Sequence, residues 1–124
     1  MTVQELYANI GGNYESAKRI LPMDKLIAKF IVKFLDDKSA EKLFSAWSGG
    51  DGTAIFEGAH ALKGVCGNLG LDALGESARI VTEECREGNT PTMGARELDG
   101  LVEKMKDDYT RTIEAIRRFS AEQS

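Results

Sequence analysis

Apolar residues recur at spacings of three and four along most of the chain, which is the pattern of amphipathic α-helices. Four such stripes stand out, over residues 26–34, 55–69, 74–85 and 98–119. No segment shows the alternation of apolar and polar residues that a half-buried strand requires, and no hairpin signal is present. The pattern therefore predicts an all-α fold.

The helices that this periodicity predicts are separated by turn and loop signals. Pro22 stands where a helix can begin, Asp51 can cap the helix that follows a glycine-rich break, and Pro91 lies in a loop. We expect helices at residues 3–10, 13–20, 23–36, 39–48, 52–69, 71–87 and 94–120. The four longer ones, 23–36, 52–69, 71–87 and 94–120, predict an antiparallel four-helix bundle with an additional N-terminal helix that caps it.

Length and composition narrow the class of protein. The 124 residues predict a single domain over 1–124, with the bundle core at about 23–120. A net charge of −4 argues against a nucleic-acid-binding protein. No apolar run is long enough to cross a membrane, and the N-terminus does not resemble a signal peptide, so we expect a cytoplasmic protein. We also expect a monomer.

The segment from residue 55 to residue 70 is unusual because it contains interior glycines. Gly58, Gly64 and Gly67 each cost a helix about 1 kcal/mol relative to alanine, so something must offset that cost. On a helical wheel Gly58 falls on the apolar side, where it lets another helix come close. Gly64 and Gly67 fall beside His60, on the side opposite Leu62, so we expect His60 to be exposed to solvent.

The exposed side of this helix has the parts that phosphoryl transfer to histidine needs. Neutral imidazole is a good nucleophile, and in-line attack on phosphorus needs open space, which Gly64 and Gly67 would leave beside His60. Lys63 falls on the same side and can compensate charge on phosphoryl oxygens. Phe56 lies one turn before His60.

The stretch Ala59-His60-Ala61-Leu62-Lys63-Gly64, followed by Gly70 ten positions after His60, resembles the histidine-containing phosphotransfer (HPt) domain of multistep two-component phosphorelays. The resemblance implies an antiparallel four-helix bundle with His60 as the phosphoacceptor, Lys63 as the neighbouring cation and Gly64 as the position that provides clearance. It implies a phosphocarrier without a nucleotide-binding kinase domain, and no cofactor of its own. Magnesium is expected on the partner.

The same resemblance implies the partners, and the positions of two further residues beside His60 suggest where a partner would make contact. His60 would take a phosphoryl group from a receiver-domain aspartate or a kinase and pass it to another receiver aspartate. Response-regulator receiver domains are the expected partners, together with a hybrid sensor histidine kinase. Phe56 and Gly67 are expected to contact the partner, although Phe56 could instead fold back against the N-terminal helix.

Two positions depart from the family pattern. Cys66 stands where many relatives have alanine or serine, and its place on the apolar side predicts a packing role. Many relatives orient the imidazole with a polar side chain, often glutamine, on the next helix. Thr82 is the nearest candidate for that role here, with Arg79 and Glu83 as neighbours that could substitute for it.

Three other interpretations compete with the phosphocarrier. Glu57 and His60 match the Glu-x-x-His spacing of di-iron bundles, but such sites need two of these motifs facing inward, so we expect no metal site. A helical-bundle adaptor that docks a signalling partner without phosphotransfer remains the main alternative. A kinase is excluded because no glycine-rich nucleotide loop with acidic magnesium ligands is present.

Overall fold

The computed structural model describes residues 1–123, and all of its secondary structure is helical, as predicted. The helices lie close to the predicted positions, although the segment 23–36 ends in a 3-10 turn and the last helix continues to residue 123. In chain order the elements are α1 (Val3–Asn9), α2 (Tyr14–Ile20), α3 (Asp24–Lys33), the 3-10 helix η1 (Phe34–Asp36), α4 (Ser39–Gly49), α5 (Gly52–Leu69), α6 (Asp72–Glu84) and α7 (Ala95–Gln123).

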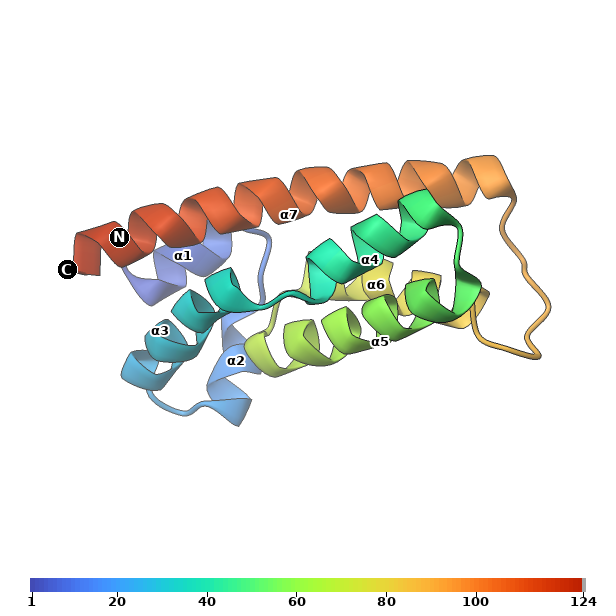
Figure 1. Ribbon diagram of the computed structural model, residues 1–124. Coiled ribbons are helices and arrows are strands. Elements are labelled where there is room, and N and C mark those ends of the chain that lie inside the picture. Colours follow the sequence, from blue (N-terminus) through green and yellow to red (C-terminus); the bar gives the residue numbers. More distant parts are fainter. Residues whose placement is uncertain (124) are drawn as a thin grey trace.

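Helix α7 runs along the whole length of the molecule, α6 packs against it, and α5 runs antiparallel to α6 on the side away from α7 (Figure 1). Helices α3 and α4 follow one another end to end, so together they form the fourth rod of an antiparallel bundle. The break between them is a stretch of extended backbone at Asp37, whose carboxylate accepts a hydrogen bond from the amide of Ser39 at 2.9 Å.

Helix α4 is short, yet it packs closely against α5. We expected residues 23–36 to supply the fourth bundle helix, but α4 packs along α5, while α3 lies with α1 and α2 at the other end of α7. Trp47, near the end of α4, is half-buried, and its indole Nε1 donates a hydrogen bond to Asp99 at 2.9 Å. This bond ties α4 to the first turns of α7.

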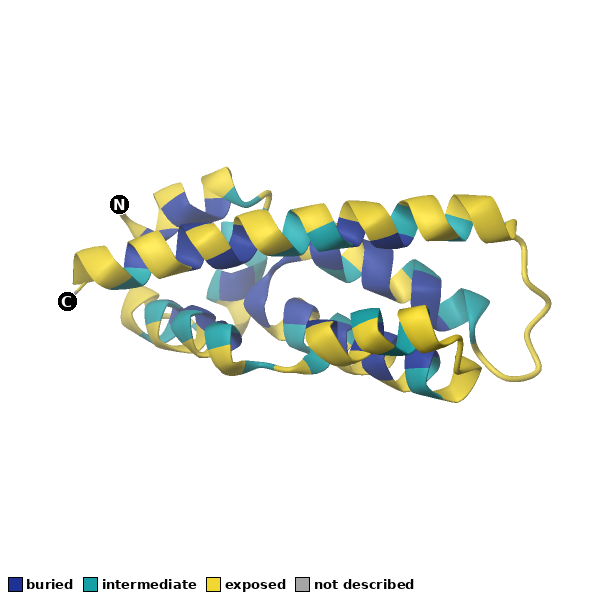
Figure 2. Cartoon of the chain, turned by 45° about the horizontal axis from the view of Figure 1, so that its top comes forward, coloured by how far each residue is buried: buried dark blue, intermediate teal, exposed yellow. Residues whose placement is uncertain are grey.

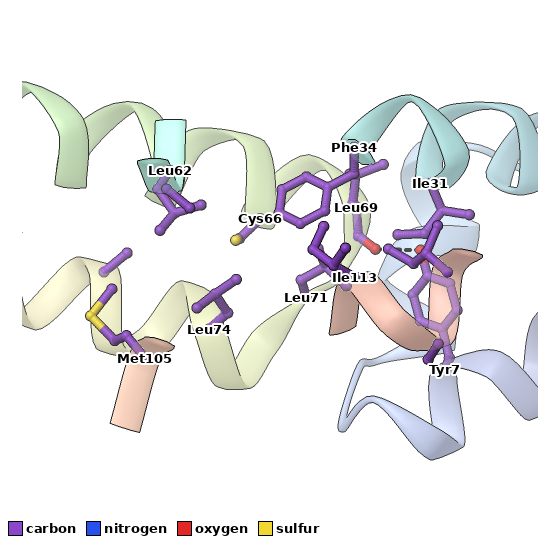
Figure 3. Packing of buried hydrophobic residues seen from close by; sticks show 14 of the residues in the cluster. Tyr7, Ile31, Phe34, Leu62, Cys66, Leu69, Leu71, Leu74, Met105 and Ile113 are labelled. Atoms are coloured by element: carbon purple, nitrogen blue, oxygen red, sulfur yellow. Dashed lines mark hydrogen bonds between the residues drawn. The ribbon is translucent and has the colours of Figure 1, made fainter. Parts of the chain in front are cut away.

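The two N-terminal helices hold the C-terminal end of α5. The hydroxyl of buried Tyr7 donates to the carbonyl of Leu69 at 2.6 Å (Figure 3). The amide of Asn13 donates to the carbonyl of Gly70 at 2.7 Å. Gly70 has a φ of +68°, and a Cβ there would lie 2.5 Å from the carbonyl oxygen of Asn13. Glycine is therefore required both by the left-handed turn and by the approach of the chain before α2.

The buried apolar residues form one cluster to which α1, α2 and η1 contribute as well as the longer helices (Figure 2). Cys66 lies in this cluster, and burial raises the pKa of its thiol to about 12. The predicted packing role of Cys66 agrees with this environment, because a thiol that stays protonated is a poor nucleophile. Over residues 1–123, no helix combines the length and the apolar character needed to cross a membrane.

Gly58 is where α4 and α5 come closest. A Cβ built on Gly58 would lie 2.9 Å from both the backbone nitrogen and the Cα of Leu43 in α4, closer than real side chains approach. The neighbour is backbone, so it cannot move aside without shifting a helix. The predicted close approach at Gly58 is confirmed, and the absence of a side chain sets the spacing of the two helices.

This contact yields a stability prediction with a matched control. Gly58→Ala should lower the free energy of unfolding by about 1–3 kcal/mol, because overpacking outweighs the roughly 1 kcal/mol of added helix propensity. Gly64→Ala, in the same helix but with no atom within 4 Å of its added Cβ, should be unchanged or more stable by up to about 1 kcal/mol. Urea denaturation of both variants measures the difference. Equal stabilities would contradict the close approach.

Candidate functional site

The site lies on the side of α5 that faces away from the core. Asp51 caps the start of the helix by accepting hydrogen bonds from the amides of Thr53 and Ala54 at 3.1 and 3.2 Å. Ala59 and Leu62 are fully buried on the opposite side. His60, near the middle of the helix, is exposed, so the predicted exposure of this imidazole is confirmed.

A strip of bare backbone adjoins His60. Gly64 and Gly67 are both exposed, and a Cβ built on either would meet no atom within 4 Å. Gly58 lies against the backbone of α4, whereas Gly64 and Gly67 face open space, so packing within the chain does not explain why glycine occupies these two positions. The open strip leaves room for another molecule to approach the imidazole from the C-terminal side of α5.

Phe56 lies next to His60 on the N-terminal side of the imidazole, one helical turn earlier in α5. The two rings are stacked, with centroids 5.7 Å apart and planes inclined by only 11°. The guanidinium carbon of Arg86, just beyond α6, lies 5.2 Å from the centre of the Phe56 ring. Phe56 is half-buried and does not belong to the apolar cluster, so it does not fold back against the N-terminal helix.

Charged side chains flank the site on the α6 side. Half-buried Lys63 lines a groove of about 370 Å³ between α5 and α6, which Gly67 and Arg79 also line. Arg79 is paired with Glu76, and Arg86 with Glu83. Hydrogen bonds from Arg86 lower the pKa of Glu83, and the nearby charge of Lys63 contributes to this shift.

Among residues 1–123, no carboxylate lies within ion-pairing distance of the Lys63 ammonium. Arg79 on α6 and Arg86 just beyond it form ion pairs with carboxylates, whereas Lys63 does not. Lys63 is therefore a cation on the His60 side of α5 that forms no direct ion pair within residues 1–123, although its charge acts on Glu83.

The structure does not support Thr82 as the residue that orients the imidazole. Thr82 is completely buried, and its hydroxyl donates to the carbonyl of Ala78 in its own helix at 2.7 Å. Its side chain therefore faces the core, while His60 faces solvent. The possible substitutes, Arg79 and Glu83, are held in ion pairs with Glu76 and Arg86.

The neighbour of the imidazole is the aromatic ring of Phe56, where a polar side chain was expected. In the part of the chain that the structure describes, no side chain makes a hydrogen bond to the imidazole, and its ring neighbour is Phe56. The spacing of four residues on one helix face was a signal for this contact. Arg86 was not singled out from the sequence, because it follows the end of α6 and its position depends on how that turn folds.

The metal-site interpretation finds no geometric support. Glu57 and His60 are both exposed on the outer side of α5, away from the bundle interior where such ligands would meet. Within residues 1–123, no three His, Cys, Asp or Glu side chains are grouped as metal ligands would be.

Comparison with protein families identifies one match, and it covers the site. The model of the Hpt domain matches residues 36–118, which is more than half of the chain and includes α4, α5, α6, most of α7 and His60. Comparison with curated proteins and with solved structures gives no match. Hpt domains relay phosphoryl groups in two-component systems, where they interact with receiver domains and kinases, and they are phosphocarriers and not kinases. An exposed histidine on a helical bundle, within a match of this extent, means that the chain belongs to the Hpt domain family.

Proposed function

We propose that His60 accepts a phosphoryl group from the phosphoaspartate of a receiver domain, or from a kinase, and passes it to another receiver aspartate. In the accepting step, the lone pair of a ring nitrogen forms an N–P bond. The P–O bond to the aspartate breaks, and its electron pair leaves on the carboxylate. The returning step is the reverse, with a second carboxylate as the nucleophile. The exposure of His60 beside open backbone is the observation that carries this proposal.

Lys63 and Gly64 have distinct parts in this proposal. The ammonium of Lys63 compensates negative charge on the phosphoryl oxygens as the N–P bond forms, and it forms no direct ion pair that would have to break, although it lies near enough to Glu83 to lower the pKa of that carboxyl. Gly64 leaves space for the acidic site of the receiver to close over the imidazole. The magnesium ion that this chemistry needs would be held by the carboxylates of the receiver, so the chain itself supplies no cofactor.

The partner surface in this proposal is centred on the exposed side of α5. Phe56 offers an apolar ring edge on one side of His60, and Gly67 offers backbone that a partner can approach closely. Because the chain has a net charge of −4, long-range attraction to an acidic receiver site is unfavourable. Short-range contact around Phe56 and the local charge of Lys63 would have to supply the binding.

Substitution of His60 separates the phosphocarrier from the adaptor alternative. Purified receiver domains carrying radiolabelled aspartyl phosphate should transfer label to the wild-type chain as acid-labile, base-stable phosphate. His60→Gln should abolish the labelling, while its binding to the same receivers, measured by calorimetry, should persist because the fold does not depend on an exposed side chain. Equal binding with no labelling of the wild-type chain would instead favour the adaptor.

Gly64→Gln tests whether the bare backbone serves clearance. The side chain would stand beside the imidazole in open space, so the melting temperature should be similar or higher while transfer from a receiver becomes at least about tenfold slower. Gly100→Gln is the matched control, since Gly100 is an exposed glycine within α7 that also has open space around its Cβ position. If both variants transferred at the wild-type rate, Gly64 would have no role in clearance.

Lys63→Ala should slow phosphoryl transfer or shorten the lifetime of phosphohistidine, without unfolding the protein. An exposed charge interaction contributes about 1 kcal/mol or less, and exclusion of water by a docked partner would strengthen it, so we expect a defect of about fivefold or more. Lys63→Arg keeps the positive charge and should lose less. Rapid-quench measurement of transfer, together with the decay of isolated phosphoprotein, checks both quantities. Wild-type values in the alanine variant would remove Lys63 from the mechanism.

A further inference from the structure

The stacked rings of Phe56 and His60 are the most specific contact at the site. The interplanar angle of 11° and the centroid distance of 5.7 Å describe an offset parallel pair, one of the arrangements that aromatic rings prefer. Both residues lie on the side of α5 that faces away from the core, one helical turn apart. The phenyl ring therefore lies nearly parallel to the imidazole and displaced sideways from it, so that it contacts the edge of one face of the exposed ring.

Such a stack restricts the imidazole without using its nitrogens. Rotation about χ2 of an exposed histidine is broad, because this torsion joins an sp³ to an sp² carbon. A phenyl ring against one face favours the orientation in which the two planes stay parallel. Both ring nitrogens lie in the plane of the imidazole, so its reactive edge stays open to solvent. A polar side chain would instead orient the ring by occupying one nitrogen.

Phe56 is itself contacted by a side chain from the segment that follows α6. The guanidinium of Arg86 lies 5.2 Å from the centre of the phenyl ring, within the range of a cation–π contact. Two hydrogen bonds fix that guanidinium, from Nε to Oε2 of Glu83 at 3.3 Å and from Nη2 to Oε1 at 3.0 Å. A continuous set of contacts thus runs from Glu83 at the end of α6, through Arg86 and Phe56, to the imidazole.

We propose that Phe56 is a positioning residue, which holds the His60 imidazole in the orientation for in-line attack and is braced by Arg86. The inference rests on the proposed role of His60 as phosphoacceptor. It assigns to an aromatic face the task that Thr82, buried and bonded to its own helix, does not perform. The same ring can also touch a partner, so the test separates orientation from docking.

The experiment compares Phe56→Leu, which removes the aromatic face, with Phe56→Tyr, which keeps it. Proton NMR reports the stack without any phosphoryl chemistry, because the ring current of Phe56 shifts the carbon-bound protons of the imidazole. These resonances should move downfield in Phe56→Leu and return towards wild-type positions in Phe56→Tyr. Melting temperatures should be similar, since Phe56 lies outside the apolar cluster.

The kinetic arm uses phosphoramidate as a small phosphodonor and then a phosphorylated receiver domain. Phosphoramidate needs no docking surface, and its P–N bond breaks with release of ammonia as the bond to His60 forms. Labelling of Phe56→Leu should be about two- to tenfold slower, the range that corresponds to loss of one aromatic pair. With the receiver, kcat should fall by a similar factor while KM changes less. Phe56→Tyr should restore both rates.

Other outcomes would overturn the proposal. Unchanged imidazole resonances in Phe56→Leu would show that the stack does not hold in solution. A raised KM with unchanged kcat, together with normal labelling by phosphoramidate, would make Phe56 a docking residue alone. If Phe56→Leu failed to fold, Arg86→Met would replace it, and this variant should shift the same resonances in the same direction by a smaller amount. Loss of labelling in the wild-type chain with the stack intact would count against the function of His60 and not against the stack.

Discussion

The position of His60 depends on how α5 is held along its length by contacts made on the side of the helix that the imidazole does not occupy. Asp51 caps its first turn, the missing side chain of Gly58 lets the backbone of α4 come close, and Gly70 ends the helix against the chain before α2. The hydroxyl of Tyr7 completes the last anchor by bonding the carbonyl of Leu69. The backbone that carries an exposed side chain on this helix is therefore held in place, although the side chain itself makes no contacts with the core.

The glycines of α5 show two opposite uses of the same residue. Gly58 has backbone atoms of Leu43 within 3 Å of where its side chain would begin, whereas Gly64 and Gly67 face open space. Each glycine costs the helix about 1 kcal/mol relative to alanine. At Gly58 the closer packing of two helices offsets that cost. At Gly64 and Gly67 nothing within the described chain does, which agrees with their proposed use by a partner.

The charges around the site are arranged so that one cation remains accessible. Arg79 and Arg86 are held by glutamates on α6, and these bonds lower the pKa of both carboxyl groups, which keeps the pairs ionised. Lys63 stands on the α6 side of His60 without a carboxylate partner of its own. In the proposed function, a phosphoryl group at the imidazole would meet this ammonium, whereas the Arg86 guanidinium is held by Glu83 and lies against Phe56. The site thus has an exposed imidazole, open space and a positive charge. In the proposed function the phosphoryl group comes from a partner.

Helical periodicity alone was sufficient to predict the all-α class, the approximate helix limits and the exposure of His60 opposite Leu62. These features are local, because spacing along one helix decides which residues share a face. For the same reason the different surroundings of Gly58 and Gly64 could be predicted from the sequence. Contacts between helices could not be predicted in this way. The register of α6 against α5 decided that Thr82 points inward and that Arg86 reaches Phe56, and the break at Asp37 decided that α4 covers α5. Contacts between helices depend on where two helices cross and on how each is rotated about its axis. Many residues distant in the sequence determine this geometry together, so no local sequence pattern predicts it.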